Sequence, residues 1–274
     1  MNASQSGKAS RFRALHERPG AFVIPNVWDG ASACVMAGLG FEALATSSSA
    51  CAGTLGRLDG QITREEALAH ARIIIAASAL PVSADLEQGF GDAPQVVAET
   101  IRQAAAVGLV GGSIEDASGD PRAPIYDFEL AVERVSAAAE AARQLPFPFT
   151  LTARTENYLH GRPDLDDTVR RLQAFELAGA DVLFAPGLPD LAAVRAVCSA
   201  VTKPVNFMVG IRGRSFSVAE LAAAGVRRIS LSTSLYRAAI TGLYAAGREV
   251  KDSGTFGYLE TIMGGKDLAD FLRH

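Results

Sequence analysis

Two carboxylates, Asp85 and Glu87, follow a short stretch in which apolar Val82 and Ala84 alternate with polar residues. Such alternation predicts a β-strand, and residues two apart on a strand face the same side. Two like charges in one space repel each other unless a cation or a proton lies between them. Oxygen ligands without nearby Cys or His favour Mg²⁺, or else Mn²⁺, over zinc. The stretch therefore predicts a cation site, with two solvated surface acids as the alternative.

Eight strand-like segments alternate with helical segments along the 274 residues. The predicted strands are 21–29, 43–49, 81–91, 108–116, 149–155, 181–185, 204–208 and 228–232. The predicted helices are 31–39, 63–78, 94–107, 127–144, 165–178, 191–200, 218–224 and 235–251. The alternation indicates an α/β protein with a parallel sheet, and eight units fit a closed (β/α)8 TIM-type barrel. We expect one domain, 1–274, with 253–274 as a C-terminal helical extension and 1–12 as a mobile arm or short helix.

Composition and charge exclude several classes of protein. The formal net charge of −4 and the lack of a basic run argue against a nucleic-acid partner. No apolar run reaches the roughly 18 residues that span a bilayer, and residues 1–13 lack an apolar signal-peptide core. Three widely spaced cysteines, Cys34, Cys51 and Cys198, predict a reduced, cytoplasmic protein. Cys34 and Cys198 fit a packed core, whereas Cys51, after a serine run, is less easily assigned.

Polar residues gather where the predicted strands end, and the strand interiors are mostly Val, Leu, Ile, Phe and Ala. Catalytic groups of such barrels lie at the C-terminal ends of the strands. The polar groups at these ends are Asn26, Trp28, Asp29, Ser47, Ser48, Ser49, Asp85, Glu87, Glu115, Asp116, Arg154, Glu156, Asn157, Asn206, Ser232, Thr233 and Ser234. We expect them to converge on one cup.

The residue types in this cup indicate its chemistry. Asp85, Glu87 and Glu115, with Asp59 from the loop after the second strand, are the predicted metal ligands. Mg²⁺ keeps several waters, so some of these acids are expected to act through water. A Mg²⁺ ion that chelates a 2-oxo acid polarises its carbonyl and stabilises an enolate. Such a site makes or breaks the bond beside that carbonyl.

Two further groups are expected to bind the substrate. Arg154 would pair with a carboxylate or phosphonate, or else form an ion pair with Glu156 or Glu115. Ser47, with the backbone amides of the next two serines, could hold a second carboxylate, and a plain turn is the alternative.

Taken in order, five motifs resemble the isocitrate lyase/phosphoenolpyruvate mutase superfamily from about Phe22 to Leu243. They are Pro25–Asp29, Ser47–Ser49 followed by Gly56 and Asp59, 85–91, Ser113–Asp116, and 152–156. The resemblance implies a (β/α)8 barrel whose last helix is exchanged between the subunits of a homodimer or homotetramer. It also implies Mg²⁺ and substrates that pass through an enolpyruvate- or oxalate-like state.

The same resemblance implies roles for individual residues. Asp85 would be the main metal ligand, and Asp59, Glu87 and Glu115 would hold metal-bound water. The predicted substrate-binding residues are Trp28, Ser47, Ser48, Ser49, Asp85, Arg154 and Asn206. The predicted catalytic residues are Arg154, Glu115, Asn206 and Ser47.

The chain departs from the family pattern in the groups that move protons. The family's usual Asp-x-Asp is Asp85-Leu86-Glu87 here. The lyases' Lys-Lys/Arg-Cys-Gly-His loop is replaced by 119–124, which has no Cys, Lys or His, and their later glutamate by Pro186-Gly187. The mutases' Asn-rich gating loop is absent too. Candidates for the missing acid or base are Tyr126, His160, Asn206 and Arg122; for His160 a surface position is the alternative. The other histidines, His16, His70 and His274, are expected to be peripheral.

These observations favour a Mg²⁺-dependent lyase of a small 2-oxo or 2-hydroxy dicarboxylate, acting by C–C cleavage or decarboxylation through an enolate. Decarboxylation of a β-keto acid needs no strong base, so it tolerates the altered loop better than retro-aldol cleavage does. A phosphonate mutase or phosphonopyruvate-type enzyme, and hydrolysis of a C–C or P–C bond, remain open. A different class of protein, a barrel that binds 2-oxo acids without catalysis, is the second hypothesis.

Overall fold

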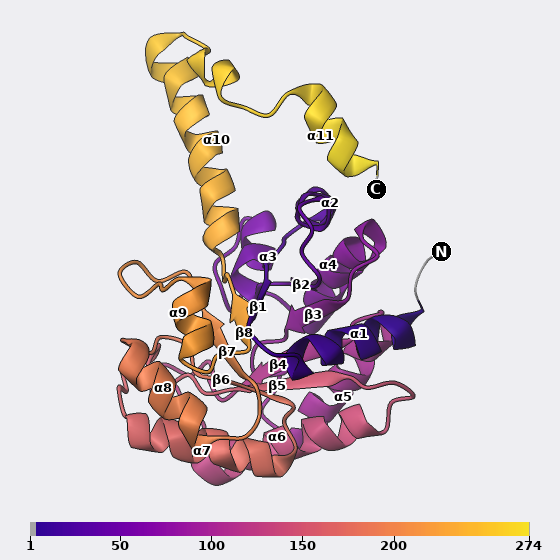
Figure 1. Ribbon diagram of the computed structural model, residues 1–274, viewed down its shortest axis with the longest axis vertical. Coiled ribbons are helices and arrows are strands. Elements are labelled where there is room, and N and C mark those ends of the chain that lie inside the picture. Colours follow the sequence, from indigo (N-terminus) through magenta and orange to yellow (C-terminus); the bar gives the residue numbers. More distant parts are fainter. Residues whose placement is uncertain (1–3, 274) are drawn as a thin grey trace.

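Eight short parallel strands form the barrel of the computed structural model, which describes residues 4–273 (Figure 1). They are β1 Phe22–Ile24, β2 Leu44–Ala45, β3 Val82–Asp85, β4 Gly111–Glu115, β5 Thr150–Arg154, β6 Val182–Phe184, β7 Val205–Met208 and β8 Arg228–Ser230. Each strand from β2 to β8 pairs with the next, β8 pairs with β1, and a single bridge between Asn26 and Ala45 joins β1 to β2. The predicted (β/α)8 barrel is confirmed. The strands are shorter than predicted because the polar residues at their ends belong to the loops that follow.

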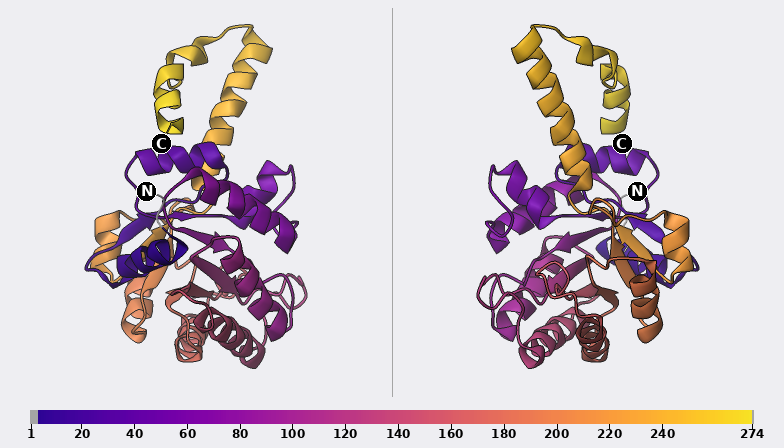
Figure 2. Two further views of the ribbon diagram at one scale, coloured as in Figure 1. Left: turned by 90° about the vertical axis from the view of Figure 1, so that its right-hand side faces the viewer. Right: turned by 90° about the vertical axis from the view of Figure 1, so that its left-hand side faces the viewer.

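Helices surround this barrel on its outer side (Figures 1 and 2). They are α2 Gly30–Gly38, α4 Arg64–Ala77, α5 Pro94–Ala106, α6 Phe128–Arg143, α7 Leu165–Ala178, α8 Leu191–Ala200 and α9 Val218–Ala223. Their starts follow local chemistry. The capping box predicted at Thr63 is present, since its hydroxyl accepts from Glu66 N–H and the Glu66 carboxylate accepts from Thr63 N–H. Asp164 and Asp190 cap α7 and α8 with their side chains, which accept from the backbone N–H three residues later.

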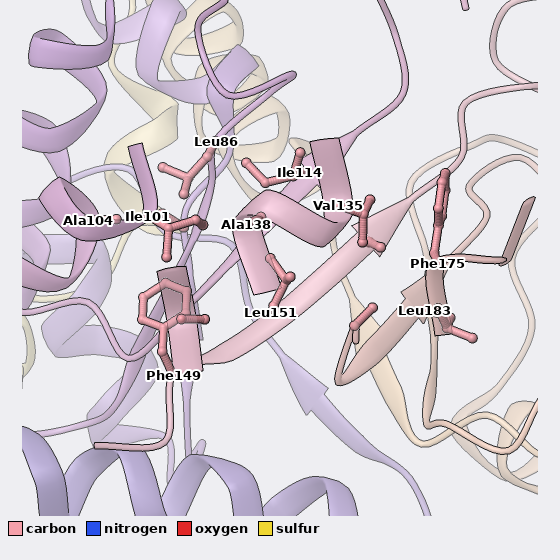
Figure 3. Packing of buried hydrophobic residues seen from close by; sticks show 14 of the residues in the cluster. Leu86, Ile101, Ala104, Ile114, Val135, Ala138, Phe149, Leu151, Phe175 and Leu183 are labelled. Atoms are coloured by element: carbon pink, nitrogen blue, oxygen red, sulfur yellow. The ribbon is translucent and has the colours of Figure 1, made fainter. Parts of the chain in front are cut away.

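The main hydrophobic core lies between strands and helices rather than inside the barrel. Figure 3 shows Ile114 and Leu151 of the strands packed among Ile101, Val135 and Phe175 of the helices. Burying each such side chain contributes about 1.5–3 kcal/mol, before the loss of conformational entropy is counted. This layer holds the strands rigidly, so the side chains at their ends keep fixed positions.

The N-terminal segment is a packed helix, α1 Gln5–Glu17. Of the two alternatives predicted for 1–12, the helix is present but runs on to Glu17, and the mobile arm was wrong. The Phe12 ring is fully buried, and its Cε1 would lie 2.9 Å from a Cβ at Gly111. Glycine at that position of β4 therefore lets α1 pack across the end of the barrel where the strands begin. His16, expected to be peripheral, is only 6% exposed and packs edge-on against Phe12 and Phe22. Residues 1–3 and His274 lie outside the described residues.

The helix after β2 was not predicted. The serine run opens α3 Ser48–Thr54, so the predicted strand 43–49 ends after Ala45. Ser47 is the N-cap, and its hydroxyl accepts a hydrogen bond from Ala50 N–H at 3.3 Å. Serine is favoured at a helix start for this reason, and Ala50 and Ala52 continue the helix.

The C-terminal extension stands apart from the barrel. The long helix α10 Ser234–Ser253 projects away, a 3₁₀ turn spans Gly257–Glu260, and α11 Gly265–Leu272 turns back towards α2 (Figures 1 and 2). No residue of α10 is buried, and Leu243 and Tyr244 are 69% and 63% exposed. The predicted exchange of this helix between subunits stays a prediction. Among residues 4–273, no helix is both long and apolar enough to cross a membrane.

Candidate active site

A cavity of about 570 Å³ opens at the C-terminal ends of the strands. It is lined by residues from all eight strands and from the loop before α4, as expected for a barrel of this kind. The predicted site residues on its wall are Ser47, Ser48, Ser49, Asp59, Asp85, Glu87, Glu115, Arg154 and Asn206. These residues lie between Ser47 and Asn206 in the sequence, and they share one space because the barrel closes.

Asp85 is the most firmly oriented acid of this cavity. Its Oδ2 accepts hydrogen bonds from the backbone N–H of Ser48 at 3.1 Å and from the Ser48 hydroxyl at 2.9 Å. Its Oδ1 accepts a long bond from Glu87 N–H at 3.3 Å, and its own N–H donates to Thr46 Oγ1. The carboxylate is therefore held by the start of α3 on one side and by its own strand on the other.

Glu87 reaches the cavity by a different route from the one predicted. β3 ends at Asp85, and Glu87 has φ +48°, so the two acids are not on one face of a strand. That left-handed conformation costs a non-glycine residue about 1–2 kcal/mol, which the surrounding fold must offset. Its Oε1 is buried without a hydrogen-bond partner. Burial, followed by the charges of Asp85 and Asp59, raises the pKa of Glu87 to about 8.

Glu115 and Arg154 are register partners on β4 and β5. Glu115 Oε2 lies 3.4 Å from Arg154 Nη1, which is also 3.9 Å from Asp85 Oδ1. Arg154 Nε donates to Glu156 Oε1. Burial raises the pKa of Glu115 well above its usual value, even though the Arg154 charge opposes that shift. The ion pairs considered as an alternative for Arg154 are thus present, and its contact with a substrate stays a prediction.

The carboxyl cluster fits a hydrated divalent ion. Burial and then the charge of Asp85 raise the pKa of Asp59 also, so the cavity carries more acid than Arg154 balances. The unpartnered Oε1 of Glu87 is an oxygen donor of the kind that Mg²⁺ prefers, directly or through water. Within residues 4–273, however, no three His, Cys, Asp or Glu side chains are close enough to hold one ion together. The arrangement therefore fits direct contact by Asp85, with the other acids acting through water.

The candidates for the missing acid or base separate clearly. Tyr126 does not line the cavity, because its hydroxyl donates to Asp92 Oδ1 at 2.5 Å under the guanidinium of Arg134. Arg122 is 91% exposed in its side chain and pairs with Asp120 in a self-bonded loop. His160 does line the cavity, although it is exposed to solvent, as the surface alternative predicted, and its Nε2 lies 4.0 Å from Glu156 Oε2.

Trp28 is the one predicted substrate-binding residue that does not line the cavity. The strand-end polar residues that were expected in the cup but do not line it are Asp29, Asp116, Asn157, Thr233 and Ser234. The Trp28 ring packs edge-on against Tyr236, with centroids 5.6 Å apart. Its carbonyl oxygen lies 2.7 Å from Nε2 of His70, which is buried rather than peripheral. Trp28 thus ties the end of β1 to α4 and α10.

The described cysteines are free thiols. Cys51 lies in α3, and burial raises its pKa to about 11, so the thiolate is scarce at neutral pH. Cys198 is shifted in the same way, and the Cys34 thiol donates to Ala77 O. A nucleophilic role for Cys51 is therefore not supported.

Sequence reasoning missed Arg228, which lies on the cavity wall at the start of β8. The available signal was the alternation of Arg228, Ser230 and Ser232 with apolar residues, since residues two apart on a strand face the same side. Small hydroxyl side chains on neighbouring strands, Ser83 and Ser113, also line the cavity and were not identified.

Comparison with known proteins agrees with this geometry. A family model described as phosphoenolpyruvate phosphomutase matches residues 12–251. Oxaloacetate decarboxylase of Bradyrhizobium diazoefficiens is 31% identical, over 72% of this chain and 69% of that protein. 2-Methylisocitrate lyase of Escherichia coli is 30% identical, over 87% of this chain and 82% of that protein.

Solved structures are similar along nearly the whole chain. A Burkholderia cenocepacia J2315 protein described only as a lyase/mutase is 53% identical, with a TM-score of 0.96 and 98% of both chains covered. Oxaloacetate acetylhydrolase, solved with its product oxalate, is 26% identical with a TM-score of 0.88, covering 98% of this chain and 94% of that one.

Proposed function

Since this chain belongs to the phosphoenolpyruvate mutase/isocitrate lyase superfamily, we propose that it is a Mg²⁺-dependent lyase of a small 2-oxo dicarboxylate. The observation that carries the proposal is the gathering of Asp59, Asp85, Glu87 and Glu115 around one cavity, with Asp85 fixed by two donors of Ser48. Relatives named for oxaloacetate support a substrate of this class.

The residues of the chain supply orientation and charge. Asp85 would contact the ion directly, and Asp59, Glu87 and Glu115 would hold its water molecules. Bound Mg²⁺ supplies a Lewis acid that polarises the carbonyl of a 2-oxo acid. Arg154 lies beside Asp85 and Glu115, so it can pair with the substrate carboxylate next to that carbonyl when the acids turn to the ion.

Decarboxylation of a β-keto acid suits this cavity best. The reaction breaks the bond between C3 and the terminal carboxylate, releases CO₂ and leaves an enolate, which takes up one proton at C3. No base is needed for the first step. The part of the cavity wall formed by residues 117–119 offers none, because only Ala117 and Gly119 line the cavity there. His160, the one imidazole among the described wall residues, can deliver the later proton.

The test is pyruvate release from oxaloacetate, followed with and without Mg²⁺ and corrected for the spontaneous reaction. Asp85→Asn keeps the shape of the side chain but removes its charge, so Mg²⁺-dependent turnover is expected to be lost. Asp166→Asn, on the exposed first turn of α7, is the matched control and is expected to behave as wild type. Turnover that persists in Asp85→Asn would refute the metal assignment.

The same assay separates the alternatives. Mg²⁺-dependent binding of 2-oxo acids without turnover of any of them would support a non-catalytic binding barrel, which the plain 119–124 loop favours. Turnover of phosphonopyruvate instead of oxaloacetate would support the phosphonate chemistry named in the family model.

We also propose a homodimer or homotetramer in which α10 and α11 cover a neighbouring barrel. The support is the apolar surface of this extension, where Leu243, Tyr244, Phe256, Ile262 and Leu272 are each at least 48% exposed. Apolar patches of this kind mark protein interfaces.

A further inference from the structure

Arg228 lies in the same cavity as Arg154, three strands further around the barrel. One row of register partners runs from Glu115 through Arg154, Phe184 and Asn206 to Arg228. All five line the cavity. Only 5% of the Arg228 surface is exposed, so its charge is almost wholly removed from water.

The immediate partners of this guanidinium are all neutral. Its Nε donates to Asn206 Oδ1 at 2.9 Å and its Nη2 to Thr152 Oγ1 at 3.0 Å. Its Nη1 lies 3.5 Å from Nε2 of His16. The His16 Nδ1 lies 2.9 Å from the Phe12 carbonyl oxygen and must donate to it, so Nε2 is the acceptor of a neutral imidazole.

No carboxylate of residues 4–273 lies within 4.0 Å of Arg228, whereas Arg154 has three acidic partners within that distance. A guanidinium carries five N–H donors, and the neighbours named above engage three of them. One N–H on each Nη therefore remains for a ligand. Two parallel N–H groups of this kind match the two oxygens of a carboxylate.

An unpaired buried cation is costly, by several kcal/mol even after relaxation. Burial lowers the pKa of Arg228 to about 9, which still leaves the group charged at neutral pH. Packing alone does not call for this charge, because barrel interiors are ordinarily filled by branched aliphatic residues. Here Ser83, Ser113 and Ser230 line the same cavity as Arg228, and their small side chains leave its interior open.

We propose that Arg228 binds the far carboxylate of a dicarboxylate substrate whose 2-oxo acid end is held at Asp85. The inference rests on the proposed function and assigns the residue that recognises the second carboxylate of its substrate. The acids of the proposed metal site, Asp59, Asp85, Glu87 and Glu115, repel a second carboxylate. Arg228 attracts that carboxylate into the barrel. The enzyme should therefore select 2-oxo dicarboxylates over 2-oxo monocarboxylates such as pyruvate.

Calorimetric titration in Mg²⁺ tests the assignment with oxalate, pyruvate, 3,3-difluorooxaloacetate and 2-oxoglutarate as ligands. Oxalate occupies the metal end alone and serves as the internal reference. In Arg228→Gln the affinity for the best dicarboxylate is expected to fall about 10- to 100-fold, as for loss of a charge-assisted hydrogen-bonded pair. Oxalate affinity is expected to change less than about 3-fold. Arg227→Gln, the neighbouring partly exposed arginine, is the matched control and should alter neither.

Equal losses for oxalate and dicarboxylate, or no loss for either, would assign Arg228 a purely structural role and overturn the proposal. If Arg228→Gln does not fold, Arg228→Lys provides the test. Lysine keeps the positive charge but lacks the paired N–H groups of the guanidinium. The ratio of dicarboxylate to oxalate affinity should fall in this variant, and an unchanged ratio would refute the assignment. A wild-type protein that binds neither oxalate nor any 2-oxo acid with Mg²⁺ would instead refute the proposed function, and this inference with it.

Discussion

Both donors of Ser48, its backbone N–H and its hydroxyl, converge on Oδ2 of Asp85 at 3.1 and 2.9 Å. The start of α3 thereby fixes the rotamer of the proposed metal ligand, and it leaves Oδ1 turned towards Glu87 and Arg154. Loss of a group that orients a ligand in this way typically weakens metal binding about 10- to 100-fold.

Removal of the Ser48 hydroxyl should therefore weaken Mg²⁺ binding without removing a ligand. In Ser48→Ala the backbone donor remains, so the Kd for Mg²⁺ is expected to rise about 10-fold, at the low end for such changes. Titration of Mg²⁺-dependent activity measures the effect. Thr54→Ala removes another hydroxyl from α3, one that donates to Cys51 O away from the cavity, and should leave the Kd unchanged. Equal effects of the two changes would contradict the role of Ser48.

The ion pairs of Arg154 predict a loss of both stability and activity in Arg154→Met. Removing one partner of a buried ion pair costs about 3–5 kcal/mol, because Glu115 and Glu156 are left unpaired. Thermal denaturation without metal measures this cost. Added Mg²⁺ should restore part of the stability, because the cation replaces the lost positive charge near the acids.

Arg162→Met is the control for that experiment, since Arg162 is exposed in the loop after β5. It should change neither the melting temperature nor its response to Mg²⁺. A melting temperature of Arg154→Met that Mg²⁺ does not raise would argue against an ion beside these acids.

The parts of this molecule that sequence could predict are those decided locally. Alternation and capping signals give the eight strand–helix units, and Thr63 with Glu66 places the start of α4 within one residue. The serine run could not be resolved locally, because Ser47 suits a strand end and a helix N-cap equally well. Glu87 was assigned to the cavity for the wrong reason, since its φ of +48° depends on the loop that follows β3.

Arg228 shows the other limit of sequence reasoning. Its lack of a counter-charge depends on which side chains meet it from β5, β7 and α1, at Thr152, Asn206 and His16. These positions are between 22 and 212 residues away in the chain, and no local pattern reports their distance.

His16 should make the fold sensitive to acid. Burial, and then the charge of Arg228, lower the pKa of His16 to about 3, against about 6.5 in the unfolded chain. Between these values the unfolded state binds the proton and the folded state does not, so stability falls as the pH falls below 6.5. The His16 contribution to the free energy of unfolding should drop by about 2 kcal/mol from pH 7 to pH 5.

Comparison with His16→Gln isolates that contribution. A glutamine amide can donate to Phe12 O and accept from Arg228, but it does not titrate. Acids with raised pKa values, such as Asp116 at about 6, oppose the trend equally in both proteins and cancel in the difference. Urea denaturation at the two pH values should show wild type losing about 2 kcal/mol more than the variant. Equal losses would show that His16 titrates normally in the folded state.

The extension formed by α10 and α11 exposes large apolar side chains. In a single chain α10 has no buried residue, although Leu243 and Tyr244 on it are largely exposed. If a second copy covers this surface, a charge there must be desolvated on association, so Leu243→Asp should shift the protein towards the monomer. Sedimentation velocity across a concentration series measures the shift.

Leu177→Asp is the control, because Leu177 on α7 is even more exposed, at 89%, but lies on the barrel's outer wall. A wild-type protein that sediments as a monomer at every concentration, or equal dissociation by both changes, would contradict an interface on α10.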